Sequence, residues 1–351
     1  MNDISYLTDF YDEKIEQIKK LDAPLNFVFY TDPHNRLSEW DCPKHPDYAP
    51  TDFESAENAV ASIQYIIDRI PNLKCVVCGG DLGCDYNDDP KLAHKSIEEM
   101  MDMLYKLTLP VHCCIGNHDD CVMASSFEPY KSFPSYEGEK KPPVSEYILY
   151  PEDLHKICMK NNPTDKTYYY TDFEDLGYRF IFLNTSDYHY GFDDKGNLIH
   201  PIIVGVTREQ VLWFKEAVKT DKKVLVFSHS PIKIQGHYPD CTKQHEDMAN
   251  GSWLWHEIQQ AENVIACFSG HLHFDNIVYD GKVVSITTDA ASSLCHGFWN
   301  WDKGSKYYRE YGTITETSFD VISIKDDSIY CTRFGAGDDR VAKIIRTFIQ
   351  K

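Results

Sequence analysis

The chain has 351 residues, of which 42% are hydrophobic and 26% charged, and its formal net charge is −20. This composition is typical of a globular protein and argues against a disordered chain. The excess of negative charge repels polyanions, so we expect neither nucleic acid nor an anionic membrane surface as a partner. The N-terminal residues lack the pattern of a signal peptide, and no window has the apolar length of a membrane span, so we expect a cytoplasmic protein. Twelve cysteines are scattered along the chain, and we expect them to be buried, reduced thiols.

Helices are predicted before and between the strands. The first twenty residues have the pattern of an amphipathic helix on the outside of the fold. Residues 53–70 and 91–107 carry apolar positions at helical spacing, and Thr207 stands where an N-cap would begin a helix through about Lys219.

Six short apolar runs, each closing on polar or glycine residues, mark the predicted strands. They lie at residues 25–34, 74–81, 110–119, 178–187, 223–230 and 263–273. Runs of this length without apolar–polar alternation are typical of strands that are buried on both faces. Their alternation with helices predicts an α/β layered fold.

The C-terminal part of the chain changes character. Two segments between residues 275 and 335 have the pattern of β-hairpins, with turns at residues 280–281 and 326–327. We expect residues 275–335 to complete a second sheet. The segment RFGAGDDR at 333–340 is interpreted as a closing turn, because Gly-x-Gly alone is too short a signal for a phosphate loop.

No linker, internal repeat or low-complexity tract interrupts the chain, so residues 1–351 are predicted to form a single domain. Residues 120–165 and 231–252 are long segments with few periodic signals. In compact enzymes such segments are commonly loops around a site, and we predict both as loop insertions near the functional site.

Five of the six apolar runs end in side chains that can bind a metal. These are Asp32 and His34 in TDPH, Asp81 in GGDLG, Asn117 and His118 in GNHD, His229 in SHSP, and His271 and His273 in GHLH. The carboxyl ends of strands in an α/β sheet are where loops converge, so we expect these side chains to meet in space. Neighbouring glycines at 79, 80, 116 and 270 permit tight turns and close approach.

The residue types indicate the kind of metal. Carboxylate, imidazole and amide oxygen without thiolate suit Mn²⁺, Fe or Zn²⁺. A carboxylate can also bridge two ions, and a pair of ions clamps the attacking and leaving oxygens of an in-line displacement at phosphorus. The predicted cofactors are therefore two divalent metal ions.

The ordered motifs D-x-H, G-D, G-N-H-D, H and G-H-x-H, which span residues 32 to 273, resemble those of the calcineurin-like metallophosphoesterase superfamily. The resemblance implies a four-layer α/β/β/α sandwich with a dinuclear centre at the strand ends. It assigns Asp32, His34, Asp81 and His273 to one metal. Asp81 would bridge to a second metal, which Asn117, His229 and His271 would complete. His118 would face the substrate as the acid or electrostatic partner of the leaving group, and Asp119 would hydrogen-bond His118.

This resemblance implies a metal-dependent phosphoesterase in which a metal-bridging hydroxide attacks a small phosphate ester, and we favour a diester over a monoester. One alternative is a non-catalytic binding scaffold of the same fold, which would be expected to lack a ligand or His118. Another is that the polar strand ends merely cap turns, in which case no metal binds. Oligomeric state is left open.

Several further residues are open candidates. His189, His237 and His296 lie in predicted rim loops and are candidates for substrate contacts. The aromatic segment 296–312 would either stack on a substrate ring or, as we favour, pack against the core. A role for Asp85 in GDLGCD is doubtful, because only the longer of the family's two spacings fits.

Overall fold

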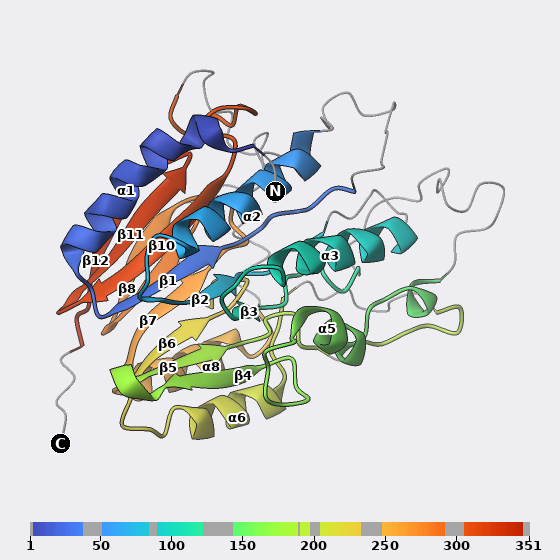
Figure 1. Cartoon of the computed structure of the whole chain (residues 1–351). Coiled ribbons are helices and arrows are strands. Elements are labelled where there is room, and N and C mark those ends of the chain that lie inside the picture. The colour runs from blue at the N-terminus through green and yellow to red at the C-terminus, as the bar shows by residue number, and fades with distance from the viewer. Residues whose placement is uncertain are drawn as a thin grey trace.

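The computed structural model describes residues 3–37, 51–83, 90–121, 143–188, 190–196, 204–232, 248–291 and 305–346. Within these ranges two six-stranded sheets stack face to face, and helices cover the outer face of each sheet (Figure 1). The layers follow the order helix, sheet, sheet, helix. The four-layer α/β/β/α fold expected from the sequence is confirmed.

The first sheet combines strands from both ends of the chain in the order β12-β11-β10-β1-β2-β3. Its strands are β1 (Leu25–Tyr30), β2 (Leu73–Cys78), β3 (Val111–Cys113), β10 (Ser318–Lys325), β11 (Ser328–Gly335) and β12 (Arg340–Lys343). β1, β2 and β3 run parallel, whereas β10 pairs antiparallel with β1. The carboxyl ends of β1, β2 and β3 therefore lie at the same end of the sheet.

The second sheet has the order β4-β5-β6-β7-β9-β8. Its strands are β4 (Tyr169–Phe173), β5 (Tyr178–Phe182), β6 (Lys223–Phe227), β7 (Val264–Ser269), β8 (Asn276–Asp280) and β9 (Val283–Thr287). β5, β6, β7 and β9 are parallel, and the two outer strands are antiparallel to their neighbours. All six apolar runs of the sequence form strands.

The helices of the described residues are η1 (Ser5–Leu7), α1 (Thr8–Leu21), α2 (Thr51–Ile67), α3 (Pro90–Leu104), η4 (Val144–Glu146), α5 (Pro151–Cys158), η5 (Glu174–Leu176), α6 (Arg208–Ala217) and α8 (Gly251–Gln260). The four helices that the sequence patterns predicted, α1, α2, α3 and α6, agree with the structure to within a few residues, and the other helices were not predicted. α6 begins where predicted, because Thr207 accepts a hydrogen bond from the backbone N–H of Gln210 at 3.2 Å. This contact satisfies one of the free N–H groups at the start of the helix.

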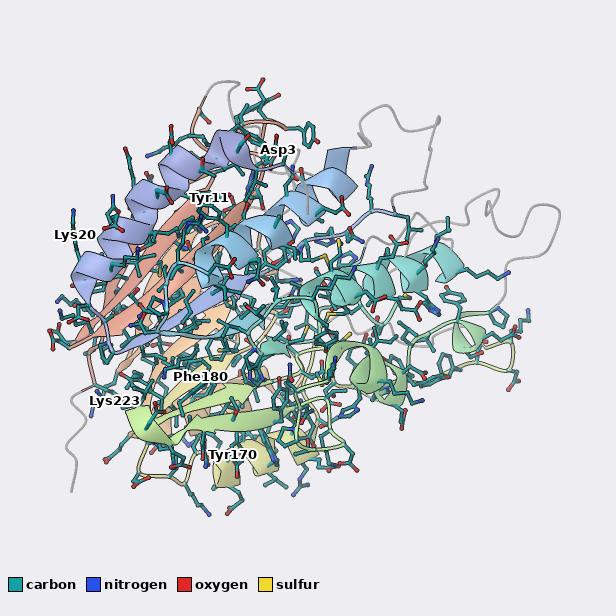
Figure 2. All side chains as sticks on the ribbon, in the orientation of Figure 1. Asp3, Tyr11, Lys20, Tyr170, Phe180 and Lys223 are labelled. Carbon is teal, nitrogen blue, oxygen red and sulfur yellow. The ribbon has the colours of Figure 1, made fainter. Side chains whose placement is uncertain are left out.

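The N-terminal helix lies on the outside of the first sheet, as predicted. Tyr11, Ile15 and Ile18 are spaced along one face of α1 and are buried. Tyr11 projects from α1 toward the strands (Figure 2), and its ring meets that of Phe334 in β11 edge-on at 5.2 Å. The contact fastens the beginning of the chain to one of its last strands.

Aromatic rings fill the space between the two sheets. Phe27 of β1 meets Phe180, Phe227 and Phe268 of β5, β6 and β7 edge-on, with ring centroids 5.0, 5.6 and 5.7 Å apart. Phe180 lies between the two sheets (Figure 2). Its neighbour Ile181 belongs instead to the core under α6 and α8, as the alternation of side chains along a strand requires. Apolar contacts therefore hold β1 of the first sheet against β5, β6 and β7 of the second.

The prediction that residues 275–335 complete one second sheet is wrong in its second half. The hairpin β8–β9 joins the second sheet, but the hairpin β10–β11 pairs with β1 in the first. Two hairpins with similar sequence patterns thus join different sheets, because the partner of a strand is decided by non-local packing.

The two predicted loop insertions are only partly described. Of residues 120–165, the described part contains η4 and the helix α5, which the sequence analysis did not predict; residues 122–142 lie outside the described ranges. Most of 231–252, namely 233–247, lies outside them too.

The cysteines in the described part of the chain are buried and not in disulfides. Burial raises the pKa of the Cys75 thiol, which keeps that thiol protonated and unreactive. In the same part of the chain, no helix has both the length and the apolar character needed to cross a bilayer.

Candidate metal centre

The side chains predicted to bind metal come together at the carboxyl ends of β1, β2, β3, β6 and β7. Hydrogen bonds between the loops hold them there: the Asp32 N–H donates to the Gly80 carbonyl, and the Gly270 N–H to the His229 carbonyl, both at 3.0 Å. The His271 N–H donates to Asp32 Oδ1 at 3.1 Å. The last bond joins a loop of one sheet to a loop of the other, so the site lies where the two sheets meet.

The backbone of this region is strained. Nine non-glycine residues among those described have a positive φ, and five of them are predicted ligands: Asp32, His34, Asp81, His271 and His273. Such conformations cost on the order of 1–3 kcal/mol each and persist where the surroundings hold them in place. Close approach requires glycine as well, since a Cβ on Gly116 would overlap Asp81 Oδ1. The strain is concentrated where the donor atoms converge.

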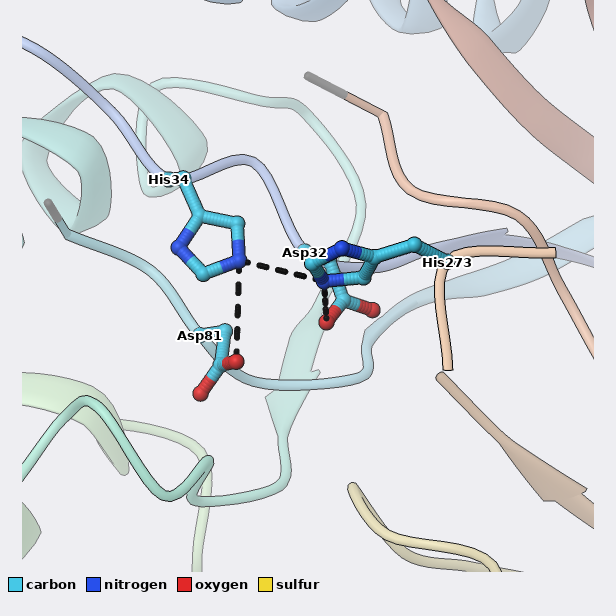
Figure 3. A group of neighbouring side chains, drawn as sticks. All are labelled: Asp32, His34, Asp81 and His273. Atoms are coloured by element: carbon cyan, nitrogen blue, oxygen red, sulfur yellow. Dashed lines mark hydrogen bonds and ion pairs between the residues drawn. The ribbon is translucent and has the colours of Figure 1, made fainter. Parts of the chain in front are cut away.

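The first cluster consists of Asp32, His34, Asp81 and His273, whose side chains point toward one another (Figure 3). His273 Nε2 lies 3.1 Å from Asp32 Oδ1 and 3.3 Å from His34 Nε2, and His34 Nε2 lies 3.6 Å from Asp81 Oδ2. One ligand atom from each residue lies within 4.8 Å of all the others. Two imidazole nitrogens directed at one point between two carboxylates fit a divalent cation.

The second cluster is built around His229. Its Nε2 lies 3.1 Å from Asp81 Oδ2, 3.0 Å from Asn117 Oδ1 and 3.1 Å from His271 Nδ1. Its Nδ1 lies 2.8 Å from the Gly79 carbonyl, which can only accept, so Nδ1 carries the proton. This bond orients the ring and leaves Nε2 directed into the cluster, the arrangement commonly found behind a metal-binding histidine.

Asp81 belongs to both clusters. Its side chain is 1% exposed, and Oδ2 faces both His34 and His229, while Oδ1 accepts a hydrogen bond from the His118 N–H at 3.0 Å. Burial by itself would raise the pKa of Asp81, but His229 and His118 hold this pKa well below its usual range. The carboxylate is therefore ionised and placed to touch two cations at once.

The same charges act on His229. Burial alone would lower the pKa of its imidazole, but Asp81 and Asp32 raise this pKa to about 9. A proton on His229 thus compensates the buried carboxylates when no metal is present. A cation bound to Nε2 would replace that proton, so metal affinity should depend on pH.

His118 differs from the clustered histidines in its exposure. Its side chain is 22% exposed, and Nε2 lies 4.0 Å from Asp81 Oδ2. Its ring centroid is 5.3 Å from that of His34. His118 therefore borders the first cluster on a side that solvent reaches.

The comparison with known families agrees with this geometry. The sequence model of the calcineurin-like phosphoesterase family matches residues 25–275, a span that contains every member of both clusters. The chain belongs to this family. A calcineurin-like phosphoesterase is a hydrolase that acts on phosphoric ester bonds, which confirms the class of activity expected from the motifs.

Two individual proteins resemble this calcineurin-like phosphoesterase. The manganese-dependent ADP-ribose/CDP-alcohol diphosphatase of Homo sapiens is 25% identical over 235 residues, in a match that covers 57% of this chain and 62% of the human protein. The match thus spans less than two thirds of the relative. The crystal structure of a dimetal phosphatase from Danio rerio has a TM-score of 0.58 at 16% identity and covers 93% of this chain and 100% of that chain. The second likeness shows the fold.

The interaction predicted for Asp119 of this phosphoesterase is wrong. Among the described residues, no hydrogen bond joins the Asp119 carboxylate to the His118 ring. Asp119 Oδ2 accepts from the backbone N–H groups of Gly116 and Asp81 at 2.7 and 3.1 Å, and Oδ1 accepts from that of Leu82 at 2.7 Å. Burial and the charge on Asp81 raise the pKa of Asp119 to about 6. Asp119 thus joins the loop after β3 to the loop after β2.

We expect Asp119→Asn to lower the free energy of unfolding by about 2 kcal/mol, because an amide nitrogen cannot accept and leaves at least one buried N–H unpaired. Urea denaturation of the metal-free protein measures this loss, with the exposed Asp153→Asn as the matched control. If Asp119→Asn instead lowered the rate of hydrolysis while its free energy of unfolding equalled that of the control, the orienting role predicted from the sequence would be restored.

Two groups that support the ligands were not predicted. Thr31 Oγ1 donates to Asp32 Oδ2 at 2.5 Å, and the Gly79 carbonyl orients His229. The position of Thr31 directly before the D-x-H motif is a signal that sequence analysis can use. A carbonyl leaves no signal of this kind, because every residue carries one.

The other candidate residues of this phosphoesterase are mostly not described. His189, His237, His296 and Asp85 lie outside the described ranges, as do residues 296–304. In the rest of the aromatic segment, the Tyr307 hydroxyl donates to Asp338 and Arg309 donates to Asp289. Tyr307 and Tyr308 are half-buried and Tyr311 is exposed, so packing of this segment against the core stays a prediction.

Proposed function

We propose that the chain uses two divalent metal ions to hydrolyse a small phosphate ester, and that it prefers a phosphorus with two substituents, as in a diester or a substituted diphosphate, over a monoester. The observation that carries the proposal is the Asp81 carboxylate, which both clusters share. The preference is supported by the human relative, named for ADP-ribose and CDP-alcohols. In such compounds each phosphorus of the diphosphate carries two substituents.

The donor sets of the two clusters fit two ions. We assign Asp32, His34, Asp81 and His273 to one ion, and Asp81, Asn117, His229 and His271 to the other. Oxygen and imidazole donors suit manganese, iron or zinc, and the manganese dependence in the name of the human relative makes Mn²⁺ the first ion to test. When bound, the two ions would neutralise charge on the phosphoryl oxygens and lower the pKa of a water that attacks phosphorus.

His118 is the residue we assign to the leaving group. Its ring borders the first cluster from the solvent side. Its own backbone N–H donates to Asp81 Oδ1 at 3.0 Å, which holds the main chain of His118 beside the shared carboxylate. Protonated His118 would donate to the departing oxygen as a general acid, which typically contributes on the order of 10²–10⁴ in rate.

The non-catalytic scaffold is disfavoured because neither a ligand nor His118 is missing. The capping alternative is disfavoured because donor nitrogens and oxygens from five loops converge on two points.

We also keep three proposals on location and partners. A cytoplasmic location is supported by the buried free thiols. The absence of a nucleic-acid partner and of a membrane partner is supported by the −20 charge.

The test compares initial rates of the Mn²⁺-reconstituted protein on nitrophenyl phosphate and on bis-nitrophenyl phosphate, followed by AMP against ADP-ribose and a CDP-alcohol. A chelated sample of the same protein is the control. We expect chelator-sensitive rates that are higher on the diester and on the substituted diphosphates. Preference for the monoesters would overturn the substrate assignment and leave the hydrolase class intact.

A further inference from the structure

The segment RFGAGDDR was interpreted as a closing turn, but it connects β11 to a further strand, β12. Its two arginines reach the loop that carries two of the candidate ligands. Arg333, which is 1% exposed, donates from Nη2 to Asp275 Oδ1 at 2.6 Å and from Nε to Asp320 Oδ1 at 2.8 Å. Arg340 Nη1 lies 2.9 Å from the same Asp275 oxygen, and its Nη2 bonds Asp320. Asp320 lies in β10 of the first sheet, whereas Asp275 follows β7 of the second. One buried guanidinium thus connects the two sheets behind the site.

Asp275 comes two residues after His273. Its Oδ1 accepts hydrogen bonds from Arg333 Nη2 at 2.6 Å and from the backbone N–H of Asp289 at 3.0 Å, and it forms an ion pair with Arg340 Nη1 at 2.9 Å. Asp289 is held in turn by Arg309 Nη2 at 2.9 Å. These contacts come from β11, from β12 and from the loop after β9, and they leave Asp275 little freedom.

The segment between Gly270 and Asp275 needs such restraint. His271 and His273 have φ values of 68° and 53°, a left-handed conformation that non-glycine residues adopt at a cost. The amino end of the segment is held by bonds from the Gly270 N–H to the His229 carbonyl and from the His271 N–H to Asp32. Asp275 supplies the corresponding attachment at the carboxyl end. Two fixed ends are what keeps a strained turn from relaxing.

We propose that Arg333 is a positioning residue for the metal centre: through Asp275 it holds the His271–His273 turn in the strained conformation that directs both imidazoles at the clusters. The inference rests on the proposed metal-dependent function. Arginine is required because its planar fork bonds Asp275 and Asp320 at the same time, whereas a lysine ammonium cannot reproduce this geometry. The buried charges alone are weak evidence of a role in stability, since apolar side chains of similar volume often stabilise as well.

The experiment compares three variants of the full chain. Asp275→Asn is isosteric and weakens the attachment of the ligand turn, and Arg333→Lys keeps the buried charge but loses the fork. Asp172→Asn is the matched control, because it alters another partly buried arginine–aspartate pair, with Arg179 in the second sheet, and leaves the contacts of Arg333, Asp320 and Asp275 unchanged. Calorimetric titration of Mn²⁺ into the metal-free proteins measures affinity. Amide hydrogen exchange of residues 270–275 measures the mobility of the turn without any metal.

We expect Asp275→Asn and Arg333→Lys to weaken Mn²⁺ binding by about tenfold or more, as loss of a residue that orients a ligand commonly does. Exchange in 270–275 should become faster in both variants, and Asp172→Asn should stay close to wild type in both readouts. If Asp275→Asn fails to fold, Arg333→Lys gives the same comparison. Equal losses of thermal stability in all three variants, with unchanged Mn²⁺ affinity and amide exchange, would overturn this inference and leave the proposed function intact. A wild-type chain that binds no Mn²⁺ would overturn the proposed function, and the inference with it.

Discussion

Asp81→Asn is expected to lower kcat at least about 1,000-fold on the best substrate and to weaken Mn²⁺ binding in both clusters. The two ions together contribute several kcal/mol of transition-state stabilisation, and each 1.36 kcal/mol corresponds to a factor of ten in rate. Asparagine has the shape of aspartate, so the bond from the His118 N–H to Oδ1 can persist. The asparagine side chain lacks the negative charge. It also lacks the second carboxylate oxygen, Oδ2, which faces His34 and His229.

The measurements are kcat and the number of Mn²⁺ ions per chain by elemental analysis. Asp221→Asn is the matched control, because this carboxylate is 97% exposed and precedes β6, whereas His229 follows the opposite end of that strand. Its kcat and metal content should equal those of the wild type. An Asp81→Asn protein with two ions and an undiminished rate would show that Asp81 does not bridge.

His118→Asn is expected to lower kcat by about 10²–10⁴ while two Mn²⁺ ions remain bound, because a general acid contributes to the rate and not to metal affinity. The loss should depend on the leaving group. A nitrophenolate departs without a proton, so the variant should lose little on nitrophenyl esters. An alkoxide needs protonation, so the loss should be large on alkyl esters.

The control for this variant is His256→Asn, which changes an exposed histidine of α8. Rates on a pair of esters that differ only in the leaving group separate the two roles His118 can have. Loss of a metal from His118→Asn would move His118 into the ligand set. An equal loss on both esters would exclude the role of general acid.

The convergence of the candidate ligands was predictable from the sequence because their positions follow from topology. β1, β2, β3, β6 and β7 are parallel strands whose buried runs are visible as apolar segments, and residues directly after such strands meet at one edge. Tight turns were also expected from the glycine beside each candidate ligand, and the structure adds that Gly116 approaches Asp81 closely. Both are local consequences of chain order.

What was not predictable depends on contacts between distant segments. The neighbours His118 and Asp119 suggested a hydrogen bond between them, but the loop after β2 lies close enough to supply three N–H groups to Asp119 instead. The pairing of β10 with β1 likewise depends on packing, as does the reach of Arg333 to Asp275. No residue pattern near Arg333 indicates that its partner lies 58 positions away.

The most direct test of a dinuclear centre bridged by Asp81 is anomalous diffraction from a crystal of the Mn²⁺-reconstituted protein. We predict two manganese peaks on either side of Asp81 Oδ2, one among Asp32, His34 and His273 and the other among Asn117, His229 and His271. A single peak, or peaks that do not touch the Asp81 carboxylate, would contradict the account.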